Sequence, residues 1–280
     1  MSVELPEISI LSQQMRETIV GKIVEVIEIT DYEKLQRLGF INHDLSEFEE
    51  LKRKTIESVV SRGLVIRLKL SEGNNLLLSP EYGGKVRFQH HQSKPPLEPY
   101  HLKICFTDYS SLYVRLTGMG LIFSVKDNKI NEIYVYRRDF SNVLSPLEED
   151  FTYERFSENL RGKIYGLKAA LVGREAVIVG FGNSSFQDVI YRARLHPKRK
   201  ISDLTPEEKR ALFNSIIDVV KERISLGGKD QFTDLHGNKG GYIPRMGGND
   251  FGKQCKNCGT RIEKLSFGGG QVYLCPKCQR

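Results

Sequence analysis

The chain has 280 residues, enough for two domains, and 39% of them are hydrophobic, which supports buried cores. Its formal net charge of +7 fits a nucleic-acid partner, but it fits a lysine-rich solvated surface equally well. No run of about twenty apolar residues could span a membrane, and the N-terminus lacks the basic and apolar regions of a signal peptide. We therefore expect an intracellular, cytoplasmic protein.

Residues 1–144 predict one helix followed by a β-rich body. Apolar residues recur at helical spacing behind Pro6-Glu7 (Ile8, Leu11, Met15 and Ile19). Short apolar runs between residues 55 and 135, separated by Gly and Asn turns, then predict a β-sandwich or small barrel. The last of these predicted strands is Ile133–Val135, and Cys105 is expected to be a buried structural thiol.

Residues 145–228 predict a mostly helical domain. Thr205-Pro206-Glu207-Glu208 is typical of a helix start, and Gly227-Gly228 ends that helix. Another predicted helix follows Gly180-Phe181-Gly182-Asn183, where a helix N-terminus could bind a phosphate. Taken alone, this motif is better explained as a tight turn with an asparagine cap.

Four cysteines predict a metal site in the last segment, residues 229–280. Cys255/Cys258 and Cys275/Cys278 form two C-x-x-C pairs, the arrangement that supplies four thiolates to one structural Zn²⁺. Two disulfides are the alternative, which an intracellular chain disfavours. Two short strands, Thr260–Ser266 and Gln271–Leu274, are expected between the pairs, behind a glycine-rich connecting loop at 229–252. The predicted fold class is α+β.

In order and spacing, these features resemble the C-terminal half of the Fpg/Nei family of DNA glycosylases, which carries a helix–two-turns–helix (H2TH) and one zinc hairpin. The Gly-Asn turn, Ala193–Pro197 and the terminal Cys-Pro-x-Cys-Gln carry the resemblance. It implies that Asn183, with Gly182, holds a phosphate of damaged, abasic or kinked duplex DNA. Lys168 resembles a second phosphate contact of the family; an exposed helical lysine is the alternative.

The N-terminal half resembles the family more loosely. Val3-Glu4-Leu5-Pro6-Glu7 is similar to the family's opening Pro-Glu-Leu-Pro-Glu, so Glu4 matches the glutamate that works as acid and base. The family's nucleophile is an N-terminal proline amine, whose place is taken by Val3. Ser2 precedes it, and Val3 has a free amine only if Met1 and Ser2 are both removed.

Other family features are also changed. The family's hairpin lysine falls on Leu64, and its zinc-hairpin arginine falls on Gly270. The loop that fills the gap left by a flipped base resembles Glu81–Gly84, where Tyr82 could stack instead.

Three interpretations remain open at this point. The first is a monomeric DNA-binding member of the family whose base excision is lost or altered. The second is an active glycosylase and abasic-site lyase that uses the amine of Ser2 or Val3 with Glu4. The third is an unrelated zinc-ribbon protein that binds RNA or a protein partner.

Overall fold

The computed structural model describes residues 3–90 and 99–280. The chain divides into two compact units, each treated by itself below. The N-terminal unit comprises Met1–Ser141 and Leu226–Gly241, and the C-terminal unit comprises Asn142–Ser225 and Tyr242–Arg280. Within the described ranges, none of the helices combines the length and hydropathy needed to cross a bilayer.

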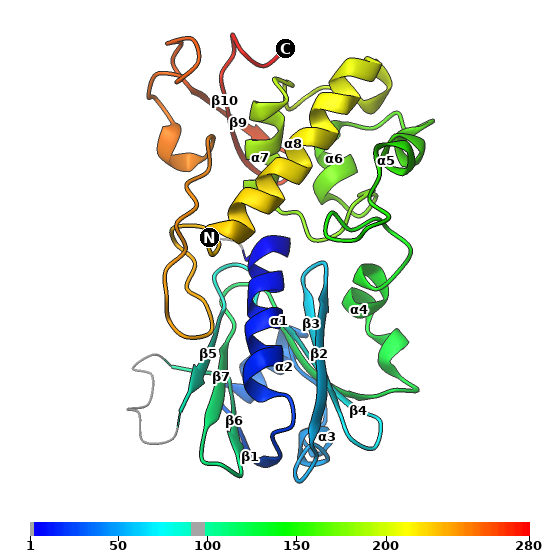
Figure 1. Ribbon diagram of the computed structural model, residues 1–280, viewed down its shortest axis with the longest axis vertical. Coiled ribbons are helices and arrows are strands. Elements are labelled where there is room, and N and C mark those ends of the chain that lie inside the picture. The colour runs from blue at the N-terminus through cyan, green and yellow to red at the C-terminus, as the bar shows by residue number, and fades with distance from the viewer. Residues whose placement is uncertain (1–2, 91–98) are drawn as a thin grey trace. The chain divides into compact units, whose positions relative to one another are not determined.

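The N-terminal unit contains two four-stranded antiparallel sheets (Figure 1). In spatial order, the first sheet consists of β1 (Val24–Ile29), β6 (Leu102–Phe106), β7 (Ser111–Arg115) and β5 (Lys85–Gln89). The second consists of β2 (Ile56–Arg62), β3 (Val65–Leu70), β4 (Asn74–Ser79) and β8 (Leu121–Lys126). The helices of this unit are α1 (Leu5–Ile19), α2 (Tyr32–Arg37), α3 (Ser46–Glu49), the 3-10 turn η1 (Ile130–Glu132) and α4 (Tyr134–Asp139).

One hydrophobic cluster joins both sheets to α1. It includes the four α1 residues predicted from helical spacing, together with alternating residues of the strands. Along β4, Leu76 and Leu78 belong to this cluster, whereas Leu77 belongs to a second cluster that contains Tyr136 of α4. Successive side chains of a strand point to opposite faces, so the second sheet is covered on both sides. The prediction of a β-rich N-terminal part in an α+β chain is confirmed.

Two local predictions need correction. Ile133–Val135 is not a strand; Ile133 caps α4, and the rings of Tyr136 and Phe140 stack at i,i+4 spacing with centroids 4.4 Å apart. Contacts at i,i+4 spacing are typical of a helix. The strand prediction rested on residues 133–135 alone and did not include the Tyr136–Phe140 pair that follows them. Cys105 is half-buried, not fully buried, and its sulfur lies 3.6 Å from Ser111 Oγ.

The C-terminal unit is helical and carries a β-hairpin (Figure 1). Its elements are α5 (Tyr153–Leu160), α6 (Leu167–Val172), α7 (Asn183–Arg192), η2 (Ile201–Asp203), α8 (Pro206–Ser225), η3 (Gly248–Asp250), β9 (Glu263–Phe267) and β10 (Gly270–Leu274). The predicted start of α8 is confirmed by reciprocal hydrogen bonds: Glu208 N donates to Thr205 Oγ1 at 3.2 Å and Thr205 N to Glu208 Oε2 at 2.9 Å. Helix α7 contacts α6, α8 and β10 and is therefore the centre of this unit.

Candidate metal centre and nucleic-acid interface

The four predicted cysteines converge at the C-terminal end of the chain. Their Sγ atoms all lie within 4.8 Å of one another, with Cys255–Cys278 at 3.8 Å and Cys258–Cys275 at 3.5 Å. A tetrahedral Zn²⁺ with Zn–S bonds of about 2.3 Å places its sulfurs about 3.8 Å apart, so the thiol set fits the ion. Hydrogen bonds from Thr260 lower the pKa of the Cys258 thiol to about 6, whereas burial raises the pKa of the Cys275 and Cys278 thiols, so only part of the set favours the thiolate before a metal binds.

Helix α7 is joined directly to this cysteine cluster and to the hairpin. The Tyr191 hydroxyl lies 3.2 Å from Cys255 Sγ, a contact that orients the sulfur from outside the metal shell. One turn earlier, Gln187 Oε1 accepts a hydrogen bond from Tyr273 N at 2.9 Å. The cysteine site and the start of α7 are therefore parts of one assembly.

The predicted phosphate-binding residues meet at the tip of the β9–β10 hairpin. Asn183, the first residue of α7, donates through Nδ2 to Gln271 O at 2.8 Å. Lys168 donates through Nζ to Phe267 O at 2.8 Å. A Cβ built on Gly270 would lie 3.7 Å from Lys168 Nζ and 3.9 Å from Asn183 Nδ2. We call Lys168, Asn183 and the tip Phe267–Gln271 the Asn183 edge.

Lys168 is therefore not the exposed helical lysine that the sequence left open. It is 9% exposed, and burial lowers the pKa of its amine. Asn183 Oδ1 is also buried and has no hydrogen-bond partner. An ammonium group has three protons and a side-chain amide two, and each group donates one of them to the hairpin here. The edge thus combines a positive charge, an amide and the N-terminus of α7, all of which favour an anion.

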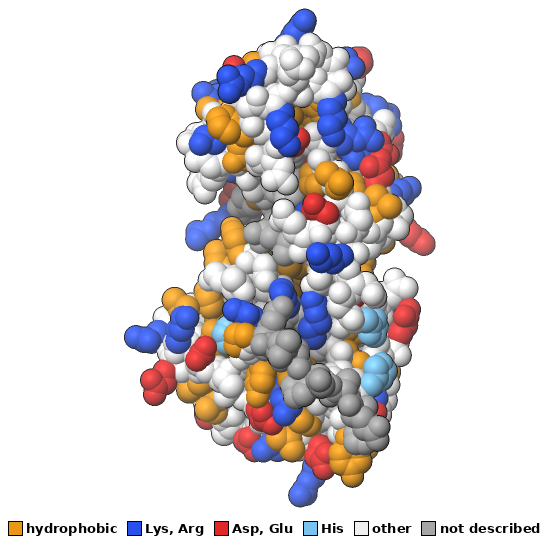
Figure 2. All heavy atoms as spheres, turned by 90° about the vertical axis from the view of Figure 1, so that its left-hand side faces the viewer, with side chains coloured by type: hydrophobic (Ala, Val, Ile, Leu, Met, Phe, Trp, Pro, Cys, Tyr) orange, Lys and Arg blue, Asp and Glu red, His pale blue; other side chains and the backbone are white. Residues whose placement is uncertain are grey.

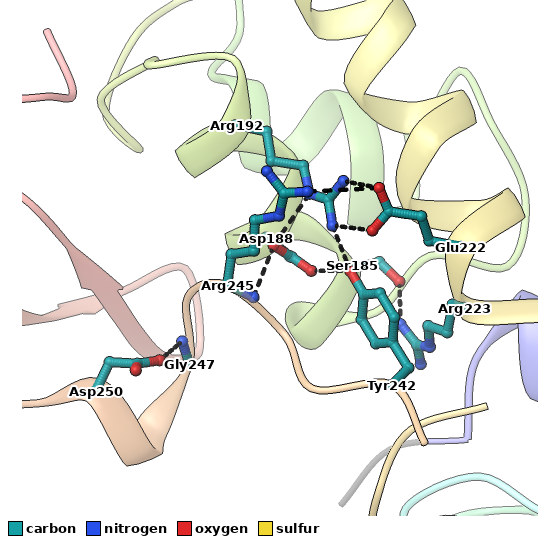
Figure 3. A network of polar contacts seen from close by, with 9 residues as sticks. All are labelled: Ser185, Asp188, Arg192, Glu222, Arg223, Tyr242, Arg245, Gly247 and Asp250. Atoms are coloured by element: carbon teal, nitrogen blue, oxygen red, sulfur yellow. Dashed lines mark hydrogen bonds and ion pairs between the residues drawn. The ribbon is translucent and has the colours of Figure 1, made fainter. Parts of the chain in front are cut away.

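A buried polar network fixes α7 within its unit (Figure 3). Asp188 accepts hydrogen bonds from the Tyr242 hydroxyl and from Arg245 N, the latter at 3.1 Å. Arg192 holds Glu222 of α8 through two hydrogen bonds of 2.9 and 2.7 Å. Burial raises the pKa of the Asp188 carboxyl, while the hydroxyl, the guanidinium and the backbone N–H favour its charged form. These contacts give the Asn183 edge a rigid support.

The predicted catalytic residues Val3 and Glu4 lie immediately before α1, and Glu4 is its N-cap. Val3 and Glu4 are both buried, and Val3 belongs to the main hydrophobic cluster. Ser2, the other candidate amine, lies outside the described residues. Sequence reasoning missed Glu7, which is fully buried and accepts from Glu4 N and from Lys229 N, each at 3.1 Å. Pro6-Glu7 signalled a helix start, but nothing in the sequence indicated a partner 222 residues away.

Tyr82 lies elsewhere in the N-terminal unit. It is 54% exposed with a left-handed φ of 49°, and its Cβ lies 3.4 Å from a Cβ built on Gly118. The turns that contain Tyr82 and Gly118 are thus neighbours, and the first presents an aromatic ring to solvent. At the tip of the β2–β3 hairpin, Leu64 N donates to Asp139 Oδ2 at 2.7 Å.

Positive charge is not confined to the Asn183 edge. On the face drawn in Figure 2, Lys and Arg side chains are spread over the surface and acidic side chains lie among them. Such a distribution provides general attraction for a polyanion, while a defined contact requires fixed donors such as those of the edge.

Comparisons with known proteins assign the family. Models of the formamidopyrimidine-DNA glycosylase N-terminal domain, the formamidopyrimidine-DNA glycosylase H2TH domain and the zinc finger found in FPG and IleRS match residues 3–119, 143–234 and 252–280. Formamidopyrimidine-DNA glycosylases of Pelotomaculum thermopropionicum and an Exiguobacterium species are 29% and 28% identical, with 99% of each chain covered.

Solved structures share the fold. Lactococcus lactis Fpg in complex with abasic-site DNA has a TM-score of 0.83 and 24% identity, covering 99% of this chain and 100% of that one. MutM in complex with DNA containing carbocyclic 8-oxo-G has a TM-score of 0.82, with the same identity and coverage. The matched regions run from the buried first turn of α1 to the four-cysteine hairpin, and the chain belongs to the formamidopyrimidine-DNA glycosylase (Fpg) family.

Proposed function

We propose that this Fpg-family protein binds abasic or damaged duplex DNA through the Asn183 edge. The observation that carries the proposal is the convergence of Lys168 Nζ and Asn183 Nδ2 on Gly270 at the N-terminus of α7. A DNA phosphate would accept from both groups and be stabilised by the helix dipole. The Lactococcus lactis relative whose fold this chain shares was solved with abasic-site DNA, which supports the choice of ligand.

The metal in this proposal is one structural Zn²⁺ held by Cys255, Cys258, Cys275 and Cys278. Its support is the four-sulfur geometry and the matched zinc-finger region. When bound, the ion supplies folding energy to a segment too short to bury its own core. The thiolates fix the base of the β9–β10 hairpin, and Lys168 and Asn183 fix its tip.

We propose that base excision is lost or altered. Val3 occupies the position of the family's nucleophile, and its side chain is buried in the main core. The second candidate function is an active glycosylase and lyase that uses the amine of Ser2 or Val3 with Glu4. Burial of Glu4, the N-cap of α1, favours this second function, because a shielded carboxyl is suited to exchange a proton. In either case Tyr82 is the exposed ring available to stack in the gap left by a flipped base.

Three further assignments belong to the same proposal. The chain works as a monomer in the cytoplasm, at the nucleoid in a bacterial cell. Its functional segments are residues 1–144 (helix and β body), 145–228 (H2TH) and 229–280 (linker and zinc hairpin). Light scattering of the purified chain tests the first assignment, since a dimer would double the measured mass.

Substitution at the edge tests DNA binding. Asn183→Ala removes one charge-assisted hydrogen bond and should weaken binding to an abasic duplex about tenfold or more, as measured by fluorescence anisotropy. Asn214→Ala, at an exposed position of α8, is the matched control and should bind like the wild type. Unchanged affinity of Asn183→Ala would reject the edge, and tighter binding to RNA than to the duplex would favour the zinc-ribbon interpretation.

A further inference from the structure

We propose that the outer face of the β9–β10 hairpin binds an unpaired, single-stranded segment of the DNA whose duplex part is held at the Asn183 edge. The inference deepens the proposed function and rests on it, because both segments belong to one DNA molecule. The face consists of Phe251, Arg261, Lys264 and Tyr273, which all lie in the C-terminal unit, and we call it the Phe251 face. It brings together two aromatic rings and two cations.

The β9–β10 hairpin has one buried side and one outer side. Val272 is 0% and Leu274 4% exposed, so these two side chains of β10 point into the unit. Tyr273 lies between them in the strand and therefore points to the other side. It is directly opposite Lys264 of β9, which is exposed. The two side chains thus form a cross-strand pair on the outer side of the hairpin.

The Phe251 ring lies beside this pair and is fixed there by its surroundings. Its centroid is 6.2 Å from that of Tyr273, and the two rings are tilted by 55°. The turn η3 packs on the tyrosine, because a Cβ at Gly248 would lie 3.6 Å from the Tyr273 hydroxyl. After the ring, Gly252 N donates to Ile262 O at 3.1 Å. Phe251 nevertheless stays 53% exposed, so it is a supported ring that faces solvent.

Two cations flank the exposed ring. Lys264 Nζ lies 5.1 Å from the ring centroid. A Cβ at Gly252 would lie 3.5 Å from Arg261 Nη2, so the guanidinium lies over the residue that follows the ring. Over residues 3–90 and 99–280, neither cation takes part in an ion pair. Asp250, which precedes the ring in sequence, accepts from Gly247 N at 2.9 Å (Figure 3). Both cations therefore keep donors for an anion.

This combination of groups fits single-stranded DNA. An unpaired base has a free π face that stacks on an aromatic ring, and the phosphates on either side of it attract lysine and arginine. The bases of a duplex are stacked on one another, so a paired segment offers no base face to Phe251. An acidic peptide would pair with the two cations and leave the exposed ring without a partner.

The Phe251 face lies within reach of DNA bound at the Asn183 edge. Three residues of β9 lead from Lys264 to Phe267, a distance of about 10 Å along the strand. One strand of B-DNA advances about 3.4 Å per nucleotide, so the distance corresponds to about three nucleotides. The expected ligand is therefore a damaged duplex with unpaired nucleotides close to the lesion.

Binding of a tailed duplex by the full-length protein tests this assignment. Fluorescence anisotropy compares a blunt abasic duplex, the same duplex with an unpaired thymidine tail, and a thymidine oligomer alone. The wild type should bind the tailed duplex about tenfold more tightly than the blunt one, because stacked bases add affinity. Phe251→Ala should lose this gain and bind the blunt duplex like the wild type, whereas Phe251→Trp should keep the gain.

Two further variants control for exposure and charge. Ile243→Ala removes another exposed hydrophobic side chain of the same unit, 70% exposed, and should keep the gain from the tail. Lys264→Gln keeps the ring but removes a cation. Its plot of log K against log salt for the thymidine oligomer should be shallower by about 0.7 than that of the wild type. Bound zinc and thermal unfolding check the fold of each variant.

Four results overturn the inference: no gain from the tail in the wild type, a gain retained in Phe251→Ala, an unchanged salt slope in Lys264→Gln, or tighter binding of a uridine RNA oligomer than of the thymidine oligomer. Any of these with intact binding of the blunt duplex leaves the proposed function standing. Loss of blunt-duplex binding in the wild type would instead remove the proposed function. The thymidine oligomer, with and without Phe251→Ala, would then still decide whether the Phe251 face binds a single strand.

Discussion

The two units of this protein use polar side chains in opposite ways. In the C-terminal unit, Lys168 and Asn183 hold the hairpin through single hydrogen bonds and keep further donors for an anion. In the N-terminal unit, Glu4 and Glu7 are buried at the start of α1, where Glu7 accepts hydrogen bonds from two backbone N–H groups. The difference shows that polar side chains can keep donors open to a ligand in one unit and join distant segments of the chain in the other.

Removal of the metal should have the largest effect, and only on the C-terminal unit. A chelator removes folding energy on the order of 10 kcal/mol from the four-cysteine site, so the hairpin should unfold and DNA binding should be lost. Hydrogen exchange should show lost protection in β9 and β10 and retained protection in β2 to β4. Metal analysis should give one zinc per chain. Equal loss of protection in both units would contradict the claim that the metal stabilises only the C-terminal unit.

Asp188→Ala should have the next largest effect. It leaves the Tyr242 hydroxyl and Arg245 N without their acceptor and should lower the free energy of unfolding by about 3 kcal/mol in a urea titration. Asp218→Asn, at an exposed position of α8, is the control and should stay within about 0.5 kcal/mol of the wild type. A loss no larger than the control's would mean that the network of Figure 3 does not support α7.

Gly270→Arg tests the anion-binding role of the C-terminal unit by adding a positive charge to the Asn183 edge. A side chain at 270 meets Lys168 and Asn183 at ordinary contact distances, so the variant should fold and bind abasic duplex about tenfold more tightly. Gly268→Ala is a structural contrast, because its φ is +55° and its Cβ would lie 2.9 Å from Lys168 Cδ. That variant should be less stable by about 1 kcal/mol. Weaker DNA binding by Gly270→Arg would place the phosphate elsewhere.

Glu81→Gln should have a small effect, confined to the N-terminal unit. Burial raises the pKa of the Glu81 carboxyl above its ordinary value of 4.5. The folded state therefore holds this proton more tightly than the unfolded chain and loses stability as pH rises above 4.5. Glutamine avoids that cost, so the variant should melt at a higher temperature at pH 7, and the gain should vanish at pH 4. A lower melting temperature at pH 7 would show that attraction to Arg138 dominates.

Much of the architecture was predictable because its signals are local. The C-x-x-C spacing, the Thr205–Glu208 cap and the helical spacing from Ile8 to Ile19 each lie within a few turns of chain, and the structure contains all three features. The α4 helix was missed because the prediction considered only Ile133–Val135, which alternate like a strand. The Tyr136–Phe140 contact that is typical of a helix lies further along the chain. The division into three functional segments stays a prediction.

The site was less predictable because its contacts are long-range. Lys168 bonds to a carbonyl 99 residues away and Glu7 to an amide 222 residues away, and no spacing rule connects such pairs. The roles of Asn183 and Lys168 in DNA binding remain predictions, as do those of Glu4 and Val3 in chemistry. What the structure adds is that the first pair meets at one point and that the second pair is buried at the start of α1.

The most direct test of the account is the salt dependence of abasic-duplex binding by Lys168→Met. If Lys168 contacts a phosphate, the plot of log K against log salt should become shallower by about 0.9 relative to the wild type. Lys221→Met, at an exposed position of α8, controls for the loss of one positive charge and should keep the wild-type slope. Parallel plots for Lys168→Met and the wild type would contradict the claim that this edge binds DNA.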